Sequence, residues 1–82
     1  MDDFLAHILV VDDDEGIRSL VKKYLNENKY LITTAKSAED ALEKIKIIKF
    51  DIIILDIMMP GKNGLEFIQE NKEDLDTPVI LL

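Results

Sequence analysis

The clearest pattern in this sequence is a series of short, unbroken apolar runs separated by amphipathic stretches. Ile52–Leu55 is such a run, with Asp51 before it and Asp56 after it. Its length, its β-branched side chains and its lack of polar alternation are typical of a strand buried on both faces. A buried helix is the alternative, but the run is short and Pro60 closes the segment. We therefore predict a strand.

Three further strands and two helices follow the same logic. Strands are predicted over residues 6–11, 30–35 and 79–82, the second of them polar enough for a sheet edge. Helices are predicted over residues 15–28 and 38–48, where apolar side chains recur at helical spacing. Asp14 can cap the first helix. Ser37 can cap the second, with Asp40 in the place of the capping-box Glu.

A third, shorter helix over residues 65–73 completes the order β-α-β-α-β-α-β. Such alternation predicts right-handed crossovers and one doubly wound parallel α/β domain over residues 1–82, with strand order 2-1-3-4. One face of this sheet would carry only the first helix, and residues 79–82 would form an uncovered apolar edge. We therefore expect a truncated domain, or a homodimer or exchanged assembly in which a second copy covers this edge.

Composition and charge exclude several classes of protein. The chain has 82 residues, 48% hydrophobic and 33% charged, as in a small globular domain. Its net charge of -7 argues against direct nucleic-acid binding, which needs clustered Lys and Arg. Without cysteine it can form neither a disulfide nor a thiolate metal site. We find no signal peptide and no apolar run long enough for a membrane helix, so we expect a cytoplasmic protein.

Aspartates follow two of the predicted strands, Asp12 and Asp13 after the first and Asp56 after the third. In the predicted strand order these strands are neighbours, so their carboxyl ends bring the acids together. Carboxylates that lie within several ångströms of one another resist ionisation unless a cation lies between them. No Lys or Arg directly follows either strand, and all-oxygen ligands suit Mg²⁺.

A carboxylate beside a bound Mg²⁺ can attack phosphorus and form an aspartyl phosphate. Asp56 stands alone at its strand end and is the candidate nucleophile. Asp13 would bind the metal directly, Asp12 directly or through water, and Asp14 would cap the helix. The alternative is that each aspartate is only a helix cap or a turn former.

Two segments resemble the receiver domain of two-component response regulators: residues 8–14, Ile-Leu-Val-Val-Asp-Asp-Asp, and residues 54–64, Ile-Leu-Asp-Ile-Met-Met-Pro-Gly-Lys-Asn-Gly. The resemblance extends from His7 to Leu82. It implies a flavodoxin-like (CheY-like) fold and a phosphoryl group accepted by Asp56 from a sensor histidine kinase. It also implies a Mg²⁺ pocket of Asp12, Asp13, Asp56 and the backbone carbonyl of Met58.

The sequence departs from this family where it ends. The family's Ser or Thr after the fourth strand, its Lys after the fifth strand and its switch aromatic would all follow Leu82. We therefore expect weak Mg²⁺ binding, slow phosphorylation and no normal switch. The segment around Met58 also resembles receivers of winged-helix transcription regulators.

Two other functions stay open at this point. A Mg²⁺-dependent phosphohydrolase would use Asp56 as its nucleophile, but such enzymes usually carry an acid two residues later, where this chain has Met58. A non-catalytic assembly fragment would pair through residues 79–82. We expect a phospho-accepting module and not an enzyme.

Overall fold

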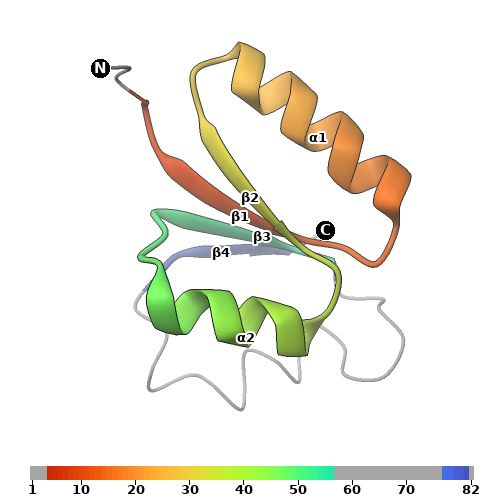
Figure 1. Ribbon diagram of the computed structural model, residues 1–82. Coiled ribbons are helices and arrows are strands. Elements are labelled where there is room, and N and C mark those ends of the chain that lie inside the picture. The colour runs from red at the N-terminus through yellow and green to blue at the C-terminus, as the bar shows by residue number, and fades with distance from the viewer. Residues whose placement is uncertain (1–3, 57–76, 82) are drawn as a thin grey trace.

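The predicted parallel sheet is confirmed by a computed structural model, which describes residues 4–56 and 77–81 (Figure 1). Its four strands lie in the order β2-β1-β3-β4, and every neighbouring pair is parallel. The strands are β1 (His7–Val11), β2 (Leu31–Ala35), β3 (Ile52–Leu55) and β4 (Val79–Leu81). The more polar β2 lies at an edge, as predicted. The helix predicted over residues 65–73 lies outside the described residues.

Helices α1 (Glu15–Glu27) and α2 (Ala38–Ile47) cover opposite faces of the sheet (Figure 1). Asp14 caps α1 by accepting a hydrogen bond from the Ile17 N–H at 3.1 Å. No helix among the described residues has the length and apolarity that a bilayer crossing requires.

The start of α2 differs in detail from the predicted capping box. The Ser37 hydroxyl accepts from the Asp40 N–H at 3.0 Å, as expected. The Asp40 carboxylate, however, accepts from the N–H of Lys36 at 3.2 Å. The helix also ends one residue early, because Ile48 has an extended backbone, yet the Ile48 side chain still packs against the core.

The larger of the two core clusters described lies between the sheet and α2. Leu9 and Val11 of β1 and Ile53 and Leu55 of β3 are at most 1% exposed on this face. Their alternate positions along each strand direct them to the same side of the sheet. Most of the hydrophobic stabilisation is therefore on the α2 side.

The α1 face is covered less completely. Ile8, Val10 and Ile32 are buried there, but Ile52 and Ile54 of β3 are only half-buried. The prediction that β3 is buried on both faces was therefore wrong for this face. A groove of about 490 Å³ runs between α1 and the sheet and is lined by Leu20, Val21, Tyr24, Leu25, Ile54 and Ile80.

Strand register brings the two acidic strand ends to the same level. Val11 of β1 is paired with Leu55 of β3, so Asp12 and Asp56 are the next residues on neighbouring strands. The Asp56 N–H donates to the Val11 carbonyl at 3.0 Å, and the Asp12 N–H donates to the Ala35 carbonyl at 3.1 Å. These bonds tie the carboxyl ends of β2, β1 and β3 together.

Candidate functional site

Three of the sequence-predicted site residues come together at the carboxyl end of the sheet. Asp12, Asp13 and Asp56 each offer a carboxylate oxygen, and these oxygens all lie within 4.8 Å of one another. Asp12 is only 5% exposed, Asp56 is half-buried and Asp13 faces solvent. The fourth predicted ligand, the carbonyl of Met58, lies outside the described residues.

Asp12 is the most buried of the three acids. Its Oδ1 accepts a hydrogen bond from the Asp14 N–H at 3.0 Å. Burial raises the pKa of Asp12, and the nearby charges of Asp56 and Asp13 raise it further, while the bond from Asp14 opposes them. The buried carboxylate is therefore costly to ionise unless positive charge is supplied.

The donor set fits Mg²⁺. This ion holds oxygen ligands at about 2.1 Å, so ligands on opposite sides of it lie about 4.2 Å apart. The three carboxylate oxygens span no more than 4.8 Å, which small side-chain rotations can close. The three donors among the described residues are carboxylates, which are hard ligands that suit Mg²⁺.

One residue beside the site was missed by the sequence reasoning. Arg18 lies one turn into α1, and its Nη1 donates to the backbone carbonyl of Asp12 at 2.7 Å. Helical side chains point back toward the N-terminus of their helix, so a long donor at this position reaches the preceding loop. That geometric rule is the signal that could have identified Arg18.

Comparisons with known proteins show the family of this chain. The family model described as the response regulator receiver domain matches residues 8–82. The transcriptional regulatory protein ResD of Bacillus subtilis is 41% identical over 75 residues, covering 92% of this chain and 31% of ResD. The chain spans about a third of the length of the curated relatives it matches first.

Solved structures give the same result. The response regulator TrrA from Thermotoga maritima, in complex with Mg²⁺-BeF, has a TM-score of 0.86 and 45% identity, covering 94% of this chain and 68% of that one. TrrA in complex with the histidine kinase ThkA has a TM-score of 0.85 and 45% identity, covering 94% and 67%. The present chain therefore belongs to the response regulator receiver domains of two-component signalling.

Proposed function

We propose that this chain accepts a phosphoryl group on Asp56, with Mg²⁺ held by Asp12, Asp13 and Asp56. The observation that carries the proposal is the convergence of three carboxylates within 4.8 Å at the ends of β1 and β3. The Mg²⁺-BeF complex of the similar TrrA supports the choice of metal. The carbonyl of Met58 remains the proposed fourth protein ligand.

In this mechanism the Asp56 carboxylate is the nucleophile. One of its oxygens forms a bond to phosphorus while the bond from phosphorus to the donor breaks, and the donor leaves with that electron pair. Bound Mg²⁺ supplies charge neutralisation for the transferring phosphoryl oxygens. Asp12 and Asp13 hold the metal, and the Asp56 N–H bond to Val11 fixes the strand end that carries the nucleophile.

The proposed donor is a sensor histidine kinase, supported by the complex of ThkA with TrrA. We further propose that the chain is the receiver part of a cytoplasmic transcription regulator, in line with the name of ResD. The sequence encoded downstream of Leu82 tests this output, and a winged-helix DNA-binding domain is the expected result.

Phosphorylation is tested with acetyl phosphate and Mg²⁺, followed by intact mass spectrometry. The wild-type chain should gain one phosphoryl group that hydroxylamine removes, as for an acyl phosphate, and Asp56→Asn should gain none. Asp51→Asn is the matched control, because Asp51 flanks the other end of β3. A phosphoryl group retained in Asp56→Asn would contradict the assignment.

A phosphohydrolase is the competing function for the same acids. We propose that the chain is not such an enzyme, because Met58, two residues after Asp56, cannot transfer a proton. Repeated turnover of a small phosphoester, lost in Asp56→Asn, would reverse this conclusion.

We also propose that the 82-residue chain pairs with a second copy through β4. Ile80 is 49% exposed and Leu81 is 40% exposed, and Ile80 also lines the apolar groove beside α1. Analytical ultracentrifugation should show that the wild-type chain is a dimer and that Ile80→Lys weakens its self-association. A wild-type chain that sediments as a monomer would contradict this proposal.

A further inference from the structure

The contact between Arg18 and Asp12 involves a particular peptide group. The acceptor is the carbonyl of Asp12, which belongs to the peptide bond that joins Asp12 to Asp13. Because a peptide unit is planar, a bond to this oxygen restrains the orientation of the whole unit. Arg18 therefore holds the link between two of the three carboxylates in the cluster.

The other polar groups of Asp12 are also held. Its N–H donates to Ala35 of β2, and its Oδ1 accepts from the Asp14 N–H. Arg18 adds the only bond that reaches this turn from a side chain of α1 among the described hydrogen bonds. The turn between β1 and α1 is thus fixed from the sheet, from its own backbone and from the helix.

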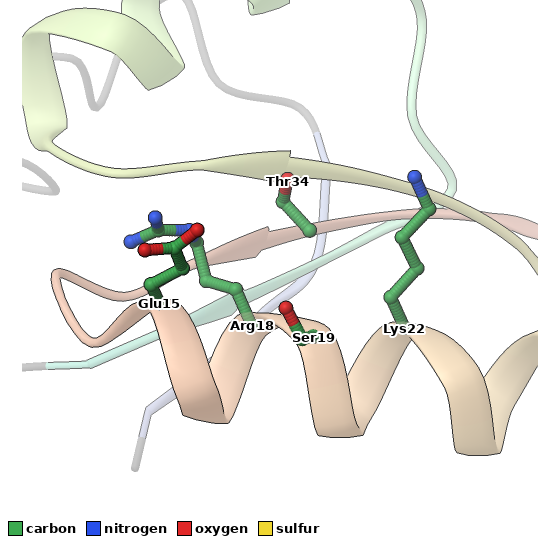
Figure 2. Close-up of a pocket in the computed structure, with 5 residues that line it drawn as sticks. All are labelled: Glu15, Arg18, Ser19, Lys22 and Thr34. Carbon is green, nitrogen blue, oxygen red and sulfur yellow. The ribbon is translucent and has the colours of Figure 1, made fainter.

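Arg18 reaches this turn through an open polar pocket. The pocket has a volume of about 210 Å³ between α1 and β2 and is lined by Glu15, Arg18, Ser19, Lys22 and Thr34. Figure 2 shows the Arg18 guanidinium directed toward the end of α1 where Glu15 lies, whereas Lys22 extends toward β2 farther along the helix. A small cation from solvent can therefore enter the space that a shortened Arg18 would leave.

We propose that Arg18 is a positioning residue for the metal pocket, which it shapes by holding the Asp12–Asp13 peptide in the orientation that Mg²⁺ binding requires. This inference rests on the proposed function, because it assumes that the acids bind Mg²⁺. Groups that orient metal ligands in this way commonly contribute about 10- to 100-fold to metal affinity.

The test compares Arg18→Ala with Lys22→Ala. Both changes remove one positive charge from the same helix and the same pocket, but only the first removes the bond to Asp12. Titration calorimetry with Mg²⁺ should show about 10-fold weaker binding for Arg18→Ala and little change for Lys22→Ala. Acetyl phosphate labelling should need correspondingly more Mg²⁺ for half its maximal rate, with the maximal rate itself nearly kept.

Chemical rescue separates positioning from a general loss of stability. Millimolar guanidinium chloride should restore part of the Mg²⁺ affinity of Arg18→Ala, while sodium chloride at equal ionic strength should not. Arg18→Lys, which keeps one donor on a long stem, should bind Mg²⁺ with intermediate affinity. Melting curves in chelator verify that each variant is folded, and Arg18→Lys carries the test if Arg18→Ala is not.

The outcomes are distinct. Wild-type Mg²⁺ affinity in Arg18→Ala, equal losses in Arg18→Ala and Lys22→Ala, or equal rescue by both salts would each overturn the positioning role while leaving the proposed function intact. A wild-type chain that binds no Mg²⁺ would overturn the proposed function, and the positioning role with it.

Discussion

Strands β1 and β3 contribute to two regions of opposite character. They bury apolar side chains on the α2 face of the sheet, and they place charged side chains at their carboxyl ends. On the α2 face, β1 and β3 contribute Leu9, Val11, Ile53 and Leu55, which are closed from water and stabilise the fold. At the carboxyl end the same strands lead into three carboxylates that repel one another. The buried core therefore supplies the stability that holds the three repelling carboxylates together.

The largest expected effect is in the core. Ile53→Ala, at a fully buried position on the α2 face, should lower the free energy of unfolding by about 3 kcal/mol, because it leaves a cavity. Ile54→Ala is the matched control on the α1 face, where the side chain is half-buried, and should cost about 1 kcal/mol. Urea unfolding measures both. Equal losses would erase the difference between the two faces.

A change of opposite sign is expected at the charged end. With chelator present, Asp12→Asn should raise the free energy of unfolding by about 1 kcal/mol, because it removes a buried charge next to Asp13 and Asp56. The same change should weaken Mg²⁺ binding by at least about tenfold. If Asp12→Asn instead lowers the free energy of unfolding in chelator, then the charge of Asp12 does not destabilise the folded chain.

The pH dependence of stability also depends on the burial of Asp12 and its repulsion by Asp56 and Asp13. The folded-state pKa of Asp12 is raised above its ordinary value of 3.8. The folded chain therefore binds the proton of the Asp12 carboxyl group more tightly than the unfolded chain does. In chelator, Asp12 should therefore make the chain less stable as pH rises from about 3.8 through the folded pKa, with no further change above it. The difference between wild type and Asp12→Asn isolates this part of the pH profile. Saturating Mg²⁺ should reduce it.

The smallest effect is expected at α2. Burial raises the pKa of Asp40, but the bonds from the Lys44 ammonium and the Lys36 N–H outweigh it, so the pKa is lowered. The ionised Asp40 therefore stabilises the fold above pH 3.8, and this stabilisation is lost as pH falls through the folded pKa. The pH dependence is opposite in sign to that of Asp12. Lys44→Met should reduce this stabilisation and cost about 0.5 kcal/mol near neutral pH. Thermal melts of the wild-type chain and of Lys44→Met from neutral to acidic pH measure the loss of stability.

The sequence predicted most of the fold because local and global signals agree in it. The run Ile52–Leu55 has the composition, length and boundaries of a strand, and the structure has a strand with these bounds. The helix caps at Asp14 and Ser37 depend on neighbours a few residues away, which a sequence pattern can show. The half-burial of Ile54 depends on how far α1 extends over the sheet, and no local pattern contains that distance.

The candidate site was predictable for a related reason. Parallel strands align their carboxyl ends, so strand order alone predicts that Asp13 and Asp56 lie close together. The contact of Arg18 was not predicted, because it depends on the angle at which α1 leaves β1 and on the side-chain rotamer. The Lys36 N–H likewise replaced the expected capping-box donor for Asp40 through the local path of the chain.

The pairing of β1 with β3 also determines which changes this segment can accept. Consecutive strand residues face opposite sides, so deleting one residue from Ile52–Leu55 would exchange the two sets of side chains and turn the following aspartate away from its partners. Replacing one aliphatic residue by another of similar volume would leave that parity unchanged. Homologues of this protein can therefore differ in the amino-acid sequence of this strand but should keep its length.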